Sequence, residues 1–161
     1  MRIGVISDTH GSLDAVARAV SIAGQVDMWL HAGDCIGDSE HLAIIAGVPV
    51  YMVAGNCDWP NVTVPEERIV DVAGHRIFLT HGHNYGVRYD TKVLAAVAEE
   101  QGADIAVYGH THIADISLGG SVCVLNPGSA ARPRDELRPS FMTAILEPGK
   151  KPVPELIRME D

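Results

Sequence analysis

Apolar runs that end in short polar clusters are the feature that most constrains the fold of this chain. The first run, Arg2–Ser7 (RIGVIS), is followed directly by Asp8 and His10. Comparable polar clusters follow four later apolar runs: Gly33-Asp34, Gly55-Asn56, His81-Gly82-His83 and Gly109-His110-Thr111-His112. Short apolar runs bounded in this way are typical of buried strands. Ligands bind outside the carboxyl ends of strands in open α/β sheets, so we expect the clusters to form one site.

The segments between the first runs predict helices. Ser12 can cap a helix in which Leu13, Val16 and Val20 recur at helical spacing, and Gly24 suits its end. The following elements are predicted as a strand, a short helix and a strand: Met28–His31, Ser39–Ala46 and Val48–Ala54. This β-α-β-α-β opening implies parallel strands.

The rest of the chain predicts antiparallel pairs. Two hairpins are expected, one around Gly74 and one around Gly119-Gly120. The other expected elements are a helix over about Thr91–Gln101 and strands over Ile105–Tyr108, Phe141–Leu146 and Glu155–Met159. The predicted fold class is therefore α/β, a layered sandwich of two mixed sheets with helices outside. At about 150 residues per domain, the 161 residues predict one domain, 1–161.

Composition excludes several classes of protein. With 47% hydrophobic and 20% charged residues the chain is not disordered, and no apolar run reaches the roughly 18 residues of a membrane span. The start MRIGVISDTH is too polar for an export signal. Three cysteines without CxxC spacing argue against a disulfide framework and favour the cytoplasm. A net charge of −9 without a basic block argues against binding long nucleic acids.

The polar clusters supply the oxygen and nitrogen ligands that suit Mn, Fe, Ni or Zn. Seven candidate metal ligands stand in them: Asp8, His10, Asp34, Asn56, His81, His110 and His112. This number oversupplies one ion and suits two, which would share a carboxylate at a separation of about 3.5–4 Å. The alternative is a hydrogen-bonded network of loop residues without a metal.

The ordered set Asp8-x-His10, Gly33-Asp34, Gly55-Asn56, His81 and Gly109-His110-Thr111-His112 resembles the calcineurin-like metallophosphoesterase superfamily. The short length, with Gly55-Asn56-Cys57-Asp58 and Asn126-Pro127-Gly128-Ser129, resembles its small YfcE-like phosphodiesterase branch. The resemblance implies a four-layer α/β/β/α sandwich. It also implies a first metal ion on Asp8, His10 and His112, a second on Asn56, His81 and His110, and Asp34 between them.

The same resemblance implies that a hydroxide between two divalent ions hydrolyses the phosphoester. Mn²⁺ is the expected metal, with Ni²⁺, Fe²⁺, Co²⁺ and Zn²⁺ as alternatives. Larger members of the superfamily usually have His where this chain has Cys57. We therefore expect His83 to assist catalysis beside Asp34 by contacting the phosphate, or else to orient the ligands. Asn56 and Arg134 are the other expected substrate contacts, although Arg134 could be an ordinary surface residue.

Histidines and acids outside the ligand set have simpler interpretations. Asp58 is expected to accept hydrogen bonds near the site. His31 is expected to pack in the core, and His75 to lie at the surface.

Three functions remain open at this point. The first is a metal-dependent phosphodiesterase acting on small phosphate esters, in the cytoplasm and with homo-oligomers plausible. The second is a catalytically silent scaffold for protein interaction, because a subunit of the retromer trafficking complex resembles this same small fold. The third is a nucleotide phosphatase or pyrophosphatase of the same superfamily.

Overall fold

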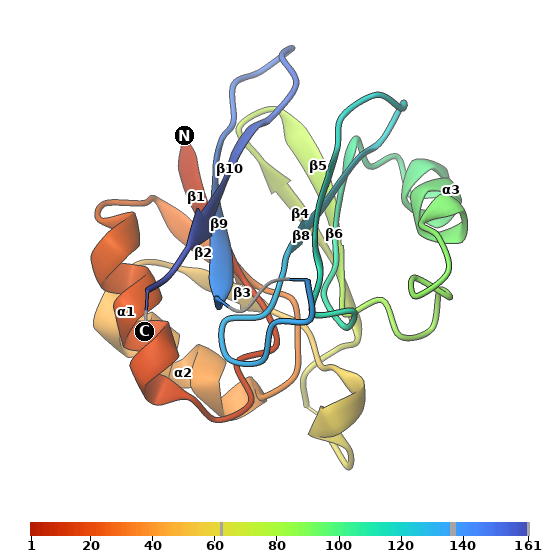
Figure 1. The fold of residues 1–161 in the computed structure, drawn as a ribbon. Helices are drawn as coiled ribbons and strands as arrows, with labels where there is room; N and C mark the ends of the chain where they lie inside the picture. The colour runs from red at the N-terminus through yellow and green to blue at the C-terminus, as the bar shows by residue number, and fades with distance from the viewer. Residues whose placement is uncertain (62, 136–137, 161) are drawn as a thin grey trace.

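Two five-stranded mixed sheets face each other in the computed structural model, with helices on the outside of both (Figure 1). The structure describes residues 1–61, 63–135 and 138–160. The first sheet has the order β10-β9-β1-β2-β3 and the second the order β4-β5-β6-β8-β7. This arrangement confirms the predicted α/β sandwich of four layers.

The first sheet has a parallel centre extended by the end of the chain. Its strands are β1 (Arg2–Ile6), β2 (Met28–His31), β3 (Val50–Met52), β9 (Ser140–Ile145) and β10 (Val153–Arg158). β1, β2 and β3 run parallel, β9 pairs antiparallel with β1, and β10 pairs antiparallel with β9. The predicted parallel opening and the two late strands are both confirmed.

The second sheet has three parallel strands between antiparallel edges. Its strands are β4 (Glu67–Val72), β5 (His75–Thr80), β6 (Ile105–Val107), β7 (Ala114–Ser117) and β8 (Cys123–Pro127). β5, β6 and β8 are parallel, whereas β4 and β7 are the antiparallel partners of β5 and β8. Both predicted hairpins are therefore present.

The helices cover the outer faces of the sheets. They are α1 (Leu13–Ala23), α2 (Ile36–Ala46) and α3 (Lys92–Glu100). α1 and α2 lie on the side of the first sheet, and α3 lies on the side of the second (Figure 1). The hydroxyl of Ser12 accepts a hydrogen bond from Ala15 N and so caps α1 as predicted. α2 begins three residues earlier than expected, after a Cys35 in left-handed conformation (φ 96°).

Strand alternation divides the core into three parts. Ile3 and Val5 of β1 face Ile77 and Leu79 of β5 between the sheets. The residues that alternate with them along each strand point to the other side of the sheet, toward the helices. Trp29 and Phe141 pack against Val16 of α1, and Phe78 packs against Leu94 of α3. Among the described residues, no helix is long and apolar enough to cross a membrane.

His75 is buried, so its predicted surface position is wrong. Its Nδ1 lies 2.6 Å from Asp104 Oδ2 and its Nε2 lies 2.9 Å from the backbone oxygen of Glu147. A residue at a hairpin turn is exposed only if no other segment covers it. Here the connection between β9 and β10 covers the turn, and no local feature of the sequence predicts that contact.

Candidate metal centre

The predicted ligands come together at the carboxyl ends of strands from both sheets. Asp8 and His10 follow β1, Asp34 follows β2, and His81 follows β5. Asn56 stands in a short 3₁₀ helix, η1 (Asn56–Asp58), after β3, and the histidines of the Gly109–His112 loop follow β6. Contacts between these side chains form two groups that meet at Asp34.

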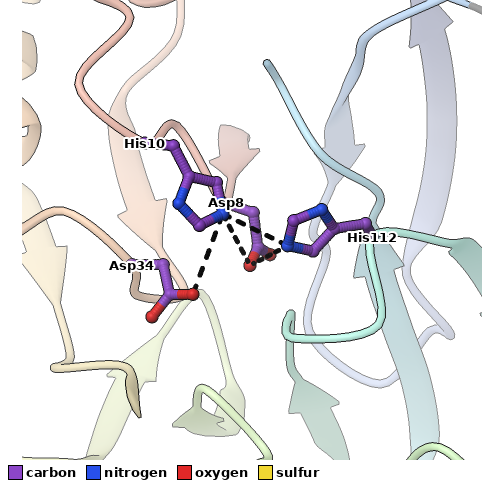
Figure 2. A group of neighbouring side chains, drawn as sticks. All are labelled: Asp8, His10, Asp34 and His112. Carbon is purple, nitrogen blue, oxygen red and sulfur yellow. Dashed lines mark hydrogen bonds and ion pairs between the residues drawn. The ribbon is translucent and has the colours of Figure 1, made fainter. Parts of the chain in front are cut away.

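The first group consists of Asp8, His10, Asp34 and His112, whose ligand atoms all lie within 4.8 Å of one another (Figure 2). His112 Nε2 lies 3.1 Å from Asp8 Oδ1 and 3.2 Å from His10 Nε2. His10 Nε2 lies 3.8 Å from Asp34 Oδ2. Two imidazole nitrogens and two carboxylates therefore face one small space.

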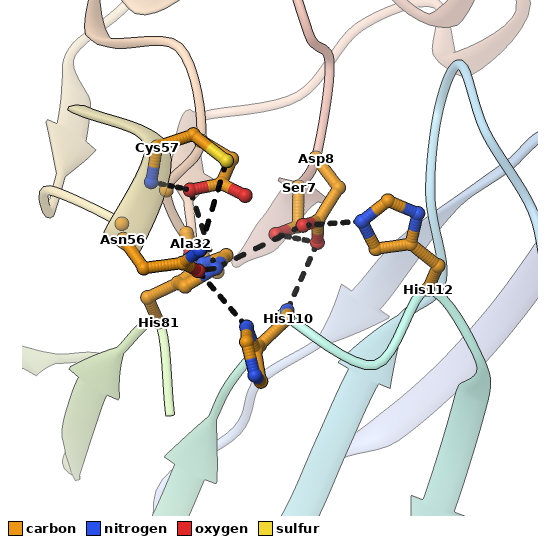
Figure 3. Close-up of polar contacts among 12 residues, drawn as sticks. Ser7, Asp8, Ala32, Asn56, Cys57, His81, His110 and His112 are labelled. Atoms are coloured by element: carbon orange, nitrogen blue, oxygen red, sulfur yellow. Dashed lines mark hydrogen bonds and ion pairs between the residues drawn. The ribbon is translucent and has the colours of Figure 1, made fainter. Parts of the chain in front are cut away.

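The second group is built around the side-chain oxygen of Asn56 (Figure 3). That oxygen lies 3.0 Å from His81 Nε2 and 3.0 Å from His110 Nδ1. His81 Nε2 is also 3.3 Å from Asp34 Oδ1. Asp34 thus directs Oδ2 to the first group and Oδ1 to the second.

The donor set fits divalent metal ions. Asp8 Oδ1 is buried and has no hydrogen-bond partner among the described residues, which is costly for a carboxylate unless a cation approaches it. The Nδ1 atoms of His81 and His112 lie 2.7 and 2.6 Å from the backbone oxygens of Ala32 and Arg132. A carbonyl only accepts, so Nδ1 carries a proton in both rings, and Nε2 is the atom that faces the site and can bind a metal ion once it carries no proton.

Charges within the site favour the ligand forms of most groups. Burial alone would raise the pKa of Asp34, but hydrogen bonds and charge from His81, with the N–H of Cys57, lower it. Burial, together with the positive charges of His81 and Arg88, lowers the pKa of His110 to about 4. The pKa of His81 is raised, because Asp34 and Asp8 outweigh its burial. A cation bound there would compete with a proton on His81.

Backbone conformation is strained at the ligands. Five of the seven have φ in the left-handed region: Asp8 (54°), His10 (45°), Asp34 (60°), His110 (67°) and His112 (60°). Residues other than glycine rarely adopt this region, and such strain is concentrated at functional sites.

Two glycines beside the ligands leave no room for a side chain. A Cβ on Gly55 would overlap the Asp34 carboxylate, and a Cβ on Gly109 would overlap the Ser7 hydroxyl and lie 2.7 Å from Asp8 Oδ2. Gly55 therefore lets two loops of the first sheet approach closely, and Gly109 lets a loop of the second sheet approach the end of β1.

Asp58 holds two ligand loops together. Its carboxylate accepts hydrogen bonds from the backbone N–H groups of Asp34, Cys35, Ile36 and Gly55 at 2.7–3.1 Å. The expectation that it accepts hydrogen bonds near the site is confirmed.

The segment after β8 supports the site from the other side. The Asn126 side chain donates to the backbone oxygen of Gly109 and to the Thr111 hydroxyl, both at 3.1 Å. The Ser129 hydroxyl donates to the backbone oxygen of Asp8 at 2.8 Å. The Asn126–Ser129 motif therefore fixes the loops that carry Asp8 and His110.

A cleft of about 410 Å³ opens over the ligands, and three arginines line it. Arg134 was expected from the sequence, and Arg132 stands beside it. Arg88 was missed, because it lies in the loop before α3 without any motif around it. Its Nε donates to His110 Nε2 at 3.1 Å. The cleft therefore pairs a ligand cluster with guanidinium groups suited to phosphate.

His83 stands apart from this cleft. It lines a neighbouring cavity of about 480 Å³, together with Trp59 and Glu66, and Asn56 lines both cavities. The His83 and His81 rings are 5.5 Å apart between centroids, and His83 Nε2 is 3.7 Å from Glu66 Oε1.

Cys57 lines the metal cleft and its side chain is exposed. Its backbone N–H donates to Asp34 Oδ1 at 3.0 Å. Partial burial and the neighbouring Asp34 carboxylate raise the pKa of the thiol to about 11. The thiol therefore keeps its proton at neutral pH.

Comparison with known proteins identifies the family of this chain. The model of the calcineurin-like phosphoesterase superfamily domain matches residues 1–149. A probable metallophosphoesterase of Methanothermobacter thermautotrophicus is 36% identical over 98% of this chain and 92% of its own. Phosphodiesterase YfcE of Escherichia coli K12 is 30% identical over 83% of this chain and 82% of its own. The chain belongs to the calcineurin-like phosphoesterase superfamily, and its relatives are named as phosphoesterases.

Solved structures share the fold. A conserved protein of Streptococcus pneumoniae, described as a predicted phosphoesterase, has a TM-score of 0.76 and 26% identity, covering 98% of this chain and 97% of its own. Vacuolar protein sorting 29 of Cryptosporidium parvum has a TM-score of 0.81 and 23% identity, covering 99% and 92%. The second likeness concerns the fold alone.

Proposed function

We propose that this chain is a metal-dependent phosphodiesterase that hydrolyses small phosphate esters at a dinuclear site. The observation that carries the proposal is the position of Asp34, which directs one carboxylate oxygen to each ligand group. Asp8, His10 and His112 would hold one ion, and Asn56, His81 and His110 the other. Mn²⁺ is the favoured metal, because carboxylate, amide and imidazole ligands suit it, and Ni²⁺, Fe²⁺, Co²⁺ and Zn²⁺ are alternatives.

Two bound divalent ions would acidify a water molecule and offset negative charge on the phosphoryl oxygens. The protein's own part is to bind and orient the ester. Arg88, Arg132 and Arg134 line the cleft and can bind phosphoryl oxygens through their N–H groups. Asn56 lines the same cleft and can turn its amide toward the substrate. Arg134 is thus proposed as a substrate contact.

Assistance to the leaving group is weak in this site. The Cys57 thiol, with a pKa of about 11, holds its proton too firmly to be an efficient acid near neutral pH. His83 does not line the metal cleft, and its ring lies beside that of His81. This position supports the alternative in which His83 orients the ligand His81. We therefore expect faster turnover of esters with good leaving groups.

Three wider properties accompany this proposal. Residues 1–161 are taken as one metallophosphoesterase domain, and the small number of cysteines favours the cytoplasm. The net charge of −9 disfavours long nucleic acids as substrates. Homo-oligomers are compatible with the exposed edge strands of the two sheets.

The test is hydrolysis of bis(p-nitrophenyl) phosphate by metal-stripped protein with and without Mn²⁺. Turnover should require Mn²⁺, and Asp34→Asn should lower kcat/KM at least about 100-fold, since several kcal/mol of charge stabilisation depend on the ions. Elemental analysis should find two ions per wild-type chain and fewer in the variant. Asp14→Asn, an exposed residue of α1, is the matched control and should leave both quantities unchanged.

Each contrary outcome points to a different alternative. One ion per chain with full activity would contradict the dinuclear site. No turnover with Mn²⁺, Ni²⁺, Co²⁺ or Zn²⁺ would contradict the enzyme and favour the scaffold. Preference for nucleoside polyphosphates over diesters would favour the pyrophosphatase.

A further inference from the structure

A second cavity lies next to the metal cleft and is larger, at about 560 Å³. The two cavities share Arg88 and Arg134 in their linings. We propose that this second cavity, the ester-group cavity, binds the organic group of the substrate's phosphoester. We further propose that it selects an uncharged group of about nucleoside size with an apolar face. The proposal rests on the proposed phosphodiesterase function and specifies its substrate class.

The shared arginines link the ester-group cavity to the reacting phosphorus. Arg88 donates to the ring of His110, and the backbone N–H of Arg134 donates to the backbone oxygen of His112 at 2.9 Å. The Arg88 side chain and the Arg134 backbone are thus attached to the loop that carries two metal ligands. A phosphoryl group bound by them in the metal cleft would have its ester oxygen at the border of the second cavity.

The walls of the ester-group cavity define the chemistry of its occupant. Val87, Tyr108 and Ile113 give it an apolar side, while Thr91 and Ser117 supply hydroxyls. Its volume lies within the roughly 300–1,000 Å³ range of small-molecule sites. A flat group with hydroxyls can therefore pack one face against the apolar side of the cavity and form hydrogen bonds with the Thr91 and Ser117 hydroxyls.

Two carboxylates argue against a second phosphate in this cavity. Asp90 and Asp115 line it. The Asp115 carboxylate already accepts hydrogen bonds from the Tyr108 and Ser117 hydroxyls, at 3.1 and 3.2 Å. Both carboxylates would repel a further anion at close range, so polyphosphate substrates are disfavoured.

The neighbouring cavity that contains His83 is a weaker candidate for the same role. It shares Asn56 with the metal cleft, but no arginine is present among its lining residues. Glu66 stands in its wall, 3.7 Å from His83. An ester group there would leave the shared arginines without a role in orienting the phosphate.

The kinetic test compares two diesters with the same leaving group, p-nitrophenyl methyl phosphate and p-nitrophenyl thymidine 5′-phosphate. The wild-type protein with Mn²⁺ should show a kcat/KM at least about tenfold higher for the thymidine ester, because only that group occupies the cavity. Ala114→Phe should fill the cavity and bring the ratio close to one. Ala17→Phe, on the exposed face of α1, is the matched control and should keep the wild-type ratio.

A second variant and a binding measurement keep the test decisive. Ser117→Leu narrows the same cavity from the exposed edge strand β7 and replaces Ala114→Phe if that protein does not fold. Calorimetry on the Mn²⁺-loaded protein should rank affinity as thymidine 5′-monophosphate first, then methyl phosphate. Thymidine 3′,5′-bisphosphate should gain nothing over the monophosphate.

The outcomes separate the two proposals. Equal kcat/KM for both diesters, or a ratio unchanged in both cavity variants, overturns the ester-group cavity and leaves the phosphodiesterase intact. No turnover of either diester with any metal overturns the phosphodiesterase. In that case equal affinities for the two monophosphates overturn the cavity as well, whereas tighter thymidine binding lost in Ala114→Phe supports it.

Discussion

Histidines in this protein take different roles according to their surroundings. His31 is fully buried, and burial lowers its pKa to about 4, so the ring is neutral. Its Nδ1 accepts a hydrogen bond from Gly33 N, and its Nε2 lies 3.1 Å from the Thr9 hydroxyl. The sequence predicted only packing for His31. The structure shows that it also joins the loops that carry Asp8 and Asp34.

The Cys57 thiol should react slowly although it is exposed. With a pKa of about 11, its thiolate fraction at pH 8 is far below that of an ordinary thiol. Alkylation by iodoacetamide at pH 8, followed by mass spectrometry of the Cys57 peptide, should be about tenfold slower or more than in urea-unfolded protein. Added Mn²⁺ should accelerate it, because the cation offsets the Asp34 charge. Equal rates in folded and unfolded protein would contradict this prediction.

At the scale of elements, the loops after the strands carry the chemistry and the strands set their spacing. The Gly109–His112 loop is tied to the first sheet, because the backbone N–H of His110 donates to Asp8 Oδ2 at 3.1 Å. Asn126 holds the same loop from β8. The close approach of the two loops depends on the absence of a side chain at Gly109.

Gly109→Ala should therefore weaken metal binding. The added methyl group would displace Ser7 and Asp8. We expect a loss of about 10–100-fold in Mn²⁺ affinity, comparable to the loss of other supporting contacts around metal ligands. Equilibrium dialysis gives the affinity, and circular dichroism checks the fold. Gly119→Ala, which places its methyl group in open space, should bind Mn²⁺ like the wild-type protein.

At the scale of the whole molecule, the site depends on the packing of one sheet against the other. Asp8, Asp34 and Asn56 come from loops of the first sheet, whereas His81 and His110 come from the second. Metal ions held by both sets would bind only the folded state and so stabilise the packed sheets.

Ile77→Ala should test this dependence, because Ile77 is fully buried between the sheets. We expect the free energy of unfolding to fall by about 2–5 kcal/mol, the range for such truncations. Urea denaturation of metal-free protein gives this quantity, and Mn²⁺ should restore part of the stability. Ile44→Ala, at a residue that is 78% exposed, should change it by no more than about 0.5 kcal/mol. A similar loss in both variants would show that inter-sheet packing is not the cause.

The sequence by itself determined the features that depend on local chemistry. Short apolar runs predicted the strands, and the ligand types after them predicted a site at the strand ends. Some boundaries shifted by a few residues: β3 covers Val50–Met52 within the predicted Val48–Ala54. Propensity alone does not fix such ends, because pairing with the neighbouring strand decides where the ladder stops.

Only the tertiary structure decided which distant groups meet. His10 and His112 approach within 3.2 Å across 102 residues of sequence, and Arg88 reaches His110 from a loop without a motif. The burial of His75 and the cavity beside the metal cleft also arise where segments that are far apart in the sequence pack together. The physical reason is that residue type and spacing specify local conformation and ligand chemistry, whereas contacts across the sandwich are set by how the two sheets bury their shared apolar face.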